Sequence, residues 1–244
     1  MTTLLGVGDL TIRFGGISAL SDVSFDVAQG HITGLIGPNG AGKTTCFNCI
    51  TRLYQPSSGR ITFKGGDLLR RAPHEITRLR IARTFQNLAL FESMSVIDNV
   101  LVGAHVRLGR TGGMSETAMR GEAATTLDYL GLRALAERPV RGLPFGTRKT
   151  VELARALAAS PELLLLDEPA AGLGSEEVSA LGEALTRIRD DFKTTILMVE
   201  HHMRLVMSVS DHVVVLDSGR KIADGAPEQI QRDPLVIEAY LGAA

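Results

Sequence analysis

The sequence lacks an excess of charge of either sign. Its 26 lysine and arginine residues nearly balance 27 aspartate and glutamate residues, which gives a formal net charge of −1. A protein whose main task is to bind the phosphate backbone of nucleic acid usually carries a basic excess, so we expect no nucleic-acid partner. The arginines that cluster are more typical of a solvated face than of a phosphate track; they are Arg70, Arg71, Arg78, Arg80 and Arg83.

Long apolar runs are also missing. Leu163 to Leu166 and Val213 to Leu216 are typical of the apolar runs present, and they are far shorter than the ~20 residues that cross a bilayer as a helix. The first residues, MTTLLGVGDLTIRF, lack the positive start, the long apolar stretch and the cleavage site of a secretory signal. We therefore expect a soluble cytoplasmic chain that reaches a membrane only through a partner.

Cysteine is scarce. The two present, Cys46 and Cys49, fit a reducing compartment. Their C-x-x-C spacing is also found in redox pairs, but both fall inside a helix that another motif already explains, which disfavours a redox role.

Strand and helix patterns alternate along the chain. Short strands separated by glycine-containing turns are predicted within the first sixty or so residues at LTIRF, VSFDVA, HITGLIG and RITFKGGDL. A helical pattern extends from Pro73 to about Leu135, with a loop at 109–113 and Ser115 as the N-cap of the helix that follows.

The second half predicts strands at LLLLD and TTILMVE, a helix from Glu176 to Arg189 and a hairpin at VVVLDSGRKIADG. The helix should pack on a sheet, because its apolar residues share one face. Short apolar strands that alternate with amphipathic helices indicate an α/β fold, with a parallel sheet covered on both faces. The apolar face of the helix consists of Val178, Leu181, Leu185 and Ile188.

The segment GPNGAGKT satisfies the spacing G-x-x-x-x-G-K-[ST] of a phosphate-binding loop. It lies between a predicted strand, HITGLI, and a predicted helix, KTTCFNCITRL. Its glycines let the backbone curl so that successive N–H groups face a phosphate, and the helix N-terminus adds positive potential there. Lys43 can reach the terminal phosphates and the Thr44 hydroxyl can bind Mg²⁺. A plain glycine-rich turn is the alternative. The predicted nucleotide-binding residues are Gly37, Pro38, Asn39, Gly40, Ala41, Gly42, Lys43, Thr44 and Thr45.

Two carboxylates close the apolar strand LLLLDE. Ligands gather at the carboxyl ends of strands in parallel sheets, which is where Asp167 and Glu168 are expected. Asp167 suits a Mg²⁺ shell, and Glu168 can orient and deprotonate an attacking water, a role typically worth ~10² to 10⁴ in rate. Two acids at a strand end could merely face solvent, but the phosphate loop favours the catalytic interpretation.

A second buried strand, TTILMVEHH, also ends in polar residues. His201 is placed to contact a γ-phosphate and the proton of the attacking water, whereas His202 is expected at the surface, at the start of a helix. A zinc site made by the pair is disfavoured, because adjacent residues rarely share one metal and no cluster of cysteines or carboxylates completes it.

Taken in order, these motifs resemble those of the ATPase subunits of ABC transporters, and the likeness covers nearly the whole chain. GPNGAGKTT is similar to the Walker A loop, TFQ to the Q-loop, LLLLDEP to Walker B and VEHH to the H-loop. The resemblance implies an ATP site with Glu168, His201 and Gln86 in catalysis, with Thr44, Gln86 and Asp167 at Mg²⁺, and with Phe14 stacked on adenine.

The resemblance also implies one ABC ATPase domain over residues 1–244. Residues 1–86 and 160–244 would form a RecA-like P-loop core with a parallel sheet and an antiparallel β subdomain. Residues 87–159 would form an inserted α-helical subdomain that carries the signature turn.

The segment LPFGT, Leu143 to Thr147, stands where this family has its signature L-S-G-G-Q, directly before the predicted helix TVELARAL. In the family two nucleotide-binding domains pair head to tail, and each signature closes over the ATP held by the other. Pro144 replaces the serine and has no N–H, Phe145 replaces a glycine and Thr147 replaces the glutamine. Because Gly146 and the helix N-terminus remain, the resemblance implies a weakened clamp. Gly174 similarly replaces an aspartate of the D-loop.

Within the family, several stretches are similar to the ATPases of branched-chain amino acid uptake. They are RFGGISAL, RTFQNLALFESMSVIDNV, DEPAAGL, VEHHMRLVMSVSDHVVVLDSG and DPLVIEAYLG. The resemblance implies an importer with two ATPase subunits, as a homodimer or a heterodimer, on the inner face of the membrane. Two transmembrane permease subunits and an external solute-binding protein would complete it.

The expected site of permease docking lies near Gln86, where Leu88, Leu90, Phe91 and Met94 could receive a permease helix or belong to the subdomain core. Three alternatives remain open: an importer of urea or another small solute, a soluble ABC ATPase of DNA repair or translation, and a regulatory module without turnover.

Overall fold

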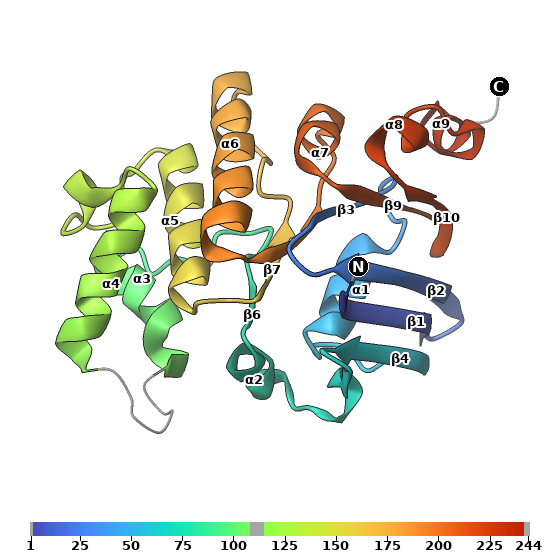
Figure 1. Ribbon diagram of the computed structural model, residues 1–244, viewed down its shortest axis with the longest axis horizontal. Helices are drawn as coiled ribbons and strands as arrows, with labels where there is room; N and C mark the ends of the chain where they lie inside the picture. Colours follow the sequence, from blue (N-terminus) through green and yellow to red (C-terminus); the bar gives the residue numbers. More distant parts are fainter. Residues whose placement is uncertain (1, 108–114, 242–244) are drawn as a thin grey trace.

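The chain folds around two β-sheets (Figure 1). The computed structural model describes residues 2–107 and 115–241. The smaller sheet is antiparallel and has the strand order β2-β1-β4-β5. Its strands are β1 (Thr3–Phe14), β2 (Ile17–Ala28), β4 (Ser58–Phe63) and β5 (Gly66–Asp67).

The larger sheet has the order β10-β9-β3-β8-β7-β6. All its neighbouring strands run parallel except β9 and β10, which form an antiparallel hairpin. The predicted parallel sheet and the predicted hairpin are therefore confirmed. The strands are β3 (Ile32–Ile36), β6 (Ile81–Arg83), β7 (Leu163–Asp167), β8 (Thr195–Val199), β9 (His212–Asp217) and β10 (Arg220–Gly225).

Strand β6 corrects the prediction of a continuous helical block from Pro73. Only α2 (Pro73–Ile76) and a 3₁₀ turn precede it, and β6 then pairs with β7 through Ile81 and Leu163. Three residues are too few to show an alternating pattern, so this edge strand is defined by pairing with its neighbour and not by local propensity. The short 3₁₀ turns are Leu68–Arg70, Thr77–Leu79, His105–Arg107 and Arg133–Leu135.

Helix α1 (Lys43–Ile50) lies between the two sheets, where Phe47 is fully buried. The helix is three residues shorter than predicted, because Arg52 adopts a left-handed conformation with φ 63°. Apolar side chains from both sheets and from α1 join in one core cluster, which holds the small sheet against one face of the large sheet.

The other face of the large sheet is covered by α6 (Ser175–Phe192), α7 (Met203–Val209), α8 (Pro227–Ile230) and α9 (Pro234–Leu241) (Figure 1). Since helices cover one face of the large sheet and the small sheet covers the other, the central strands β3, β8 and β7 are buried. The predicted face of α6 packs here as expected, through Val178, Leu181, Leu185 and Ile188.

A third core cluster joins α3 (Val96–Ala104), α4 (Glu116–Tyr129) and α5 (Phe145–Ala158) beside the large sheet, at the left of Figure 1. Ser115 caps α4 as predicted, because its hydroxyl accepts a hydrogen bond from Ala118 N. The predicted loop at 109–113 lies outside the described residues. Among the residues described, no helix has both the length and the apolar character needed to cross a bilayer.

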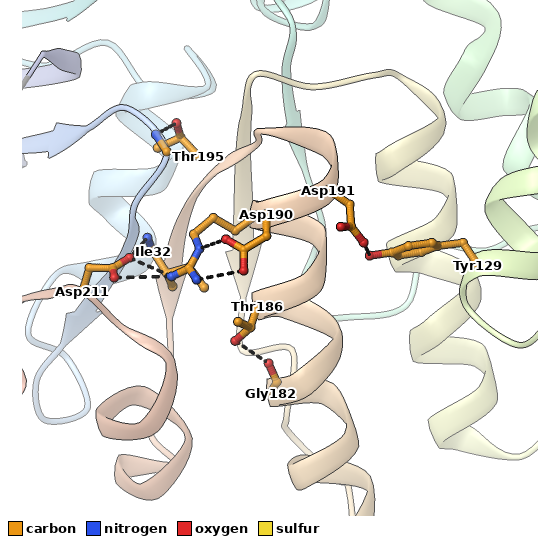
Figure 2. A network of polar contacts seen from close by, with 10 residues as sticks. Ile32, Tyr129, Gly182, Thr186, Asp190, Asp191, Thr195 and Asp211 are labelled. Atoms are coloured by element: carbon orange, nitrogen blue, oxygen red, sulfur yellow. Dashed lines mark hydrogen bonds and ion pairs between the residues drawn. The ribbon is translucent and has the colours of Figure 1, made fainter.

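The amino edge of the large sheet, where its parallel strands begin, is closed by paired polar groups (Figure 2). Asp211 accepts a hydrogen bond from Ile32 N at 2.8 Å and forms an ion pair with Arg189 of α6. The Thr195 hydroxyl accepts a second backbone hydrogen bond, from Gly30 N at 2.9 Å. On α6, Asp191 accepts a hydrogen bond from the Tyr129 hydroxyl at 2.7 Å, which joins α6 to α4. These contacts fix the edge opposite the candidate site.

Candidate active site

The phosphate-binding loop connects β3 to α1, as its spacing predicts. Lys43 is buried and turns back on the loop, where its Nζ donates to the carbonyls of Gly37 and Pro38 at 2.8 and 2.9 Å. Burial lowers the pKa of Lys43, and the charges of Glu168 and Asp167 oppose that shift. The lysine therefore lies in the field of both acids.

Glycine is required at two turns of this loop for different reasons. Gly37 has φ 148°, and a Cβ there would lie 2.0 Å from the carbonyl oxygen of Leu216. Gly42 has φ 99°, and its Cβ would lie 2.7 Å from the Ala19 carbonyl oxygen. The loop is thus pressed against two neighbouring segments, and only the absence of a side chain allows its path.

Asp167 ends β7 with its carboxylate buried. Its Oδ2 forms an ion pair with Arg83 at 2.7 Å. Both side chains are shielded from solvent, since that of Asp167 is 2% exposed and that of Arg83 is 7% exposed. Arg83 also donates to Asn48 at 2.7 Å and lies over the Phe85 ring. The prediction of a solvated arginine face is therefore wrong for Arg83, because its charge is paired with an acid inside the protein.

The other oxygen of the Asp167 carboxylate, Oδ1, is buried without a hydrogen-bond partner in the part of the chain that the structure describes. An unpaired buried carboxylate oxygen is costly unless a cation or another donor joins it.

Glu168 stands at the centre of a three-residue contact. Its Oε2 accepts a hydrogen bond from Gln86 Nε2 at 2.9 Å, and its Oε1 lies 2.9 Å from His201 Nε2. The backbone of Glu168 is left-handed, with φ 50°, and is held by a hydrogen bond from its N–H to Val199 O at 2.9 Å. Two residues far apart in the sequence, Gln86 and His201, are thus brought to one carboxylate.

His202 is exposed and is the N-cap residue of α7, in agreement with the expectation for that residue.

Phe14 lies at the end of β1 and is 47% exposed. Its ring packs edge-to-face with Tyr54, with centroids 5.2 Å apart. Tyr54 was not predicted from the sequence, because its position after α1 gives no pattern that links it to β1. Together the two rings offer an exposed aromatic surface.

The segment LPFGT is less of a turn than predicted. Pro144 is the N-cap residue, and α5 begins at Phe145, so Phe145, Gly146 and Thr147 form the first helical turn. The first N–H that bonds within the helix is Arg148 N, to Pro144 O at 3.0 Å. Proline cannot cap with its side chain, but it is compatible with the entry to a helix, and the expected turn was placed too far along the chain.

Two glycine contacts tie this helix start to α6 and to the loop before it. A Cβ on Gly146 would lie 2.1 Å from the Glu177 carboxylate, and one on Gly172 would lie 2.8 Å from the Phe145 ring. Glu177 in turn accepts a hydrogen bond from Gly174 N at 2.9 Å. Gly146 therefore allows α5 and α6 to approach closely, a packing role that the motif alone does not reveal.

Lys149, also on α5, was missed by the sequence analysis. It is buried, and its Nζ donates to the carbonyl oxygen of Glu168 at 3.4 Å. Its spacing is that of an ordinary basic helix position, so only the fold shows that it reaches the residue after β7.

The region expected to receive a permease helix contains a groove of about 1060 Å³ between β6, α3 and α5. Of the four predicted residues, Phe91 lines the groove and is exposed, and Phe85, which was not predicted, does the same. Leu88, Leu90 and Met94 are not among its lining residues: Leu90 packs partly against the third core cluster, and Leu88 and Met94 are half-buried.

The two cysteines are free and buried in the core between the sheets. Burial raises the pKa of both thiols, that of Cys49 to about 11. Reactive cysteines are partly exposed and have a lowered pKa, so the environment disfavours a redox pair here.

Comparison with known proteins shows similarity over nearly the whole chain. A family model described as "ABC transporter" matches residues 20–171, and one described as "Branched-chain amino acid ATP-binding cassette transporter" matches residues 220–244. The chain is 43% identical to the high-affinity branched-chain amino acid transport ATP-binding protein LivG of Salmonella typhimurium, over 99% of this chain and 98% of the relative. It is 42% identical to the corresponding protein BraF of Pseudomonas aeruginosa, with the same coverage.

Among solved structures, an ATP-binding cassette of an ABC transporter in its ADP conformation superposes with a TM-score of 0.89. That protein is 30% identical, and the superposition covers 100% of both chains.

Proposed function

The chain belongs to the ABC transporter family of ATP-binding proteins, and on that premise we propose that it hydrolyses ATP to drive an importer of branched-chain or related amino acids. The observation that carries the proposal is the convergence of Gln86 and His201 on the Glu168 carboxylate, at the edge of the sheet that carries the phosphate loop. Its relatives are ATP-binding proteins of branched-chain amino acid transport, and a family model of that description also matches the C-terminal residues 220–244.

Glu168 is the proposed general base. Its carboxylate takes a proton from the water whose oxygen attacks the terminal phosphorus of ATP, while the bond from that phosphorus to the ADP oxygen breaks. His201 and Gln86 hold the two carboxylate oxygens on opposite sides, so the acid has few other orientations. This arrangement supports proton removal from one defined position.

The phosphate loop is proposed to bind the triphosphate. The residues Gly37, Pro38, Asn39, Gly40, Ala41, Gly42, Lys43, Thr44 and Thr45 would surround it with backbone N–H groups and the start of α1. Lys43 would exchange its two loop carbonyls for phosphate oxygens, which are stronger acceptors for an ammonium group. Phe14, supported by Tyr54, would stack on adenine.

A magnesium ion fits the donors at the end of β7. Asp167 Oδ1 is buried and unpaired among the described residues, and carboxylate, hydroxyl and amide oxygens are the ligands that Mg²⁺ takes. Asp167, Thr44 and Gln86 would hold the ion, and Gln86 can do so through its amide oxygen because its nitrogen bonds to Glu168. When bound, the ion neutralises charge on the phosphate oxygens.

A second ATPase subunit is proposed to complete the site. Leu143 and Pro144 lead into α5, whose first residues, Phe145, Gly146 and Thr147, have N–H groups with no partner within the helix. Those groups would face the ATP of the second subunit. In the proposed division of the chain, with a core at 1–86 and 160–244 and a helical subdomain at 87–159, this helix start belongs to the helical subdomain.

The groove beside β6 is proposed to receive a helix of a transmembrane permease subunit on the inner face of the membrane, and an external binding protein would deliver the solute. Phe85 and Phe91 supply exposed apolar area in this groove. Because Phe85 directly precedes Gln86, a helix docked there would act on a residue that contacts the catalytic carboxylate.

Uptake by cells tests the proposal. Deleting the gene from the source organism should abolish uptake of labelled leucine, isoleucine and valine. The wild-type gene should restore uptake, and Lys43→Ala, which removes the phosphate-binding ammonium, should not. Normal uptake of these amino acids with loss of urea uptake would show that the transported solute is urea and not a branched-chain amino acid. Sensitivity to DNA damage without any transport defect would instead favour a soluble ATPase of DNA repair.

A further inference from the structure

Glu200 is a buried carboxylate that none of the roles above uses. It follows β8 and is 1% exposed. Within residues 2–107 and 115–241, it forms no ion pair with a lysine, arginine or histidine side chain. A carboxylate without a cation in the interior must be satisfied by hydrogen bonds, because desolvation of the charge is otherwise expensive.

Three backbone N–H groups satisfy it. Oε1 accepts a hydrogen bond from Ala170 N at 2.6 Å, and Oε2 accepts hydrogen bonds from His201 N at 2.9 Å and from His202 N at 3.2 Å. Ala170 belongs to the loop after β7, and the two histidines belong to the loop after β8. One side chain therefore joins the two loops that carry Glu168 and His201.

The carboxylate has a chemical advantage over other side chains here. Both of its oxygens are acceptors, and hydrogen bonds to a charged acceptor are stronger than neutral ones. A glutamine of the same shape has one acceptor oxygen, so its amide NH₂ would face at least one of the three N–H donors.

The three hydrogen bonds to Glu200, called the Glu200 clamp from here on, lie next to a strained stretch of backbone. Glu168 has φ 50°, a left-handed conformation that persists only where its surroundings enforce it. One anchor is the bond from its own N–H to Val199 O. The bond from Ala170 N to Glu200 is a second anchor, two residues further along the chain.

We propose that Glu200 is a positioning residue that sets the distance between the Glu168 carboxylate and the His201 ring. This inference rests on the proposed ATP hydrolysis, and it assigns Glu200 no contact with substrate. Without the Glu200 clamp, the bond from Glu168 N to Val199 O remains, but Ala170 is no longer tied to the loop after β8, and the 2.9 Å contact between Glu168 and His201 is no longer fixed.

The test compares Glu200→Gln with a matched control, Asp211→Asn. Asp211 also accepts a backbone N–H, that of Ile32, but lies at the amino edge of the same sheet. For each variant, the turnover number of ATP hydrolysis, the dissociation constant of a fluorescent ATP analogue and the melting temperature are measured.

Glu200→Gln should lower turnover by about a hundredfold, the typical cost of a misplacement near 1 Å, and leave the dissociation constant within about twofold. Asp211→Asn should lower the melting temperature and leave turnover unchanged. Wild-type turnover in Glu200→Gln would overturn the positioning role. A loss of turnover matched by an equal loss of nucleotide binding would also overturn it, because that pattern reports general damage.

Should Glu200→Gln fail to fold, Glu200→Asp preserves the charge and shortens the reach. It should fold and lose about tenfold in turnover, and unchanged turnover would again contradict the proposal. Absence of hydrolysis by the wild-type chain together with its partner subunits would instead refute the proposed function itself, so the two failures are distinguishable.

Discussion

The two edges of the large sheet differ in how fully their carboxylates are paired. At the amino edge, Arg189 pairs with Asp211, and Thr195 accepts a backbone N–H, so the strand starts are tied to one another and to α6 (Figure 2). At the carboxyl edge, Asp167 Oδ1 is unpaired among the described residues, and Glu168 is held in a left-handed conformation. The first arrangement stabilises the fold, and the second leaves an acceptor for the ligand proposed above. Substitutions at the two edges should therefore separate activity from stability.

The largest effect is expected at the centre of the carboxyl edge. Glu168→Gln preserves the shape but removes the base, so steady-state ATP hydrolysis should fall by roughly 10² to 10⁴, while ATP binding persists. Phosphate release and equilibrium nucleotide binding measure the two properties. Glu162→Gln, at the start of β7, is the control and should hydrolyse ATP at the wild-type rate. Wild-type hydrolysis by Glu168→Gln would remove this residue from its role.

Two arginine–carboxylate pairs span β6 and β7, one at each edge, and they permit a direct comparison. Arg83 and Asp167 are 7% and 2% exposed, whereas Arg80 and Glu162 are 43% and 23% exposed. Arg83→Met leaves an unpaired buried charge and should lower the free energy of unfolding by ~3–5 kcal/mol. Arg80→Met should cost at most ~1 kcal/mol, because water screens the exposed pair. Chemical denaturation measures both, and equal losses would contradict the distinction.

The shape of the phosphate loop is expected to depend on close steric contacts, so alanine substitutions at two of its glycines should differ in their cost to stability. Gly37→Ala forces a Cβ to within 2.0 Å of a backbone oxygen, whereas Gly40→Ala, with φ 81°, meets no atom within 4 Å. We expect a loss of roughly 2–4 kcal/mol for Gly37→Ala and about 1 kcal/mol for Gly40→Ala, measured by thermal unfolding without nucleotide. If the two alanine variants melted at the same temperature, the close contact with Leu216 would not constrain the loop.

The smallest effect is expected at the amino edge. Thr195→Val keeps the shape of the side chain and removes the acceptor of Gly30 N, at a cost of about 1 kcal/mol. For a chain of this size that corresponds to a fall of roughly 2–4 °C in melting temperature. ATP hydrolysis should stay at the wild-type rate, and a fall in turnover would show that the two edges are coupled.

The sequence predicts those parts of this molecule that depend on local spacing. The phosphate loop and the acid pair follow from motifs, and the packed face of α6 follows from its period. Glu200 was missed because a carboxylate beside two histidines gives no sign of burial, and its three donors come from loops that meet only in the fold. Arg83 was grouped with solvated arginines because its partner, Asp167, is 84 residues away.

Strand β6 and the start of α5 show the same limit. Three residues carry too little periodicity to indicate a strand, and β6 exists because β7 pairs with it. Proline and glycine in LPFGT favoured a turn, but proline is also acceptable at a helix entry, and Gly146 is needed for contact with Glu177. In both cases tertiary packing decided between local alternatives.

Helix α5 belongs to two cores at once, and this has an evolutionary consequence. Leu153 and Leu157 pack toward the large sheet, while Val151 and Ala154 pack toward α3 and α4. Strands β6 and β7 are parallel neighbours and therefore need a crossover connection between them. Helix α5, the last helix before β7, could serve as that crossover alone. The segment that contains α3 and α4 is then not needed to connect these two strands. Recombination could exchange it between relatives, provided that the Val151 and Ala154 face of α5 is kept.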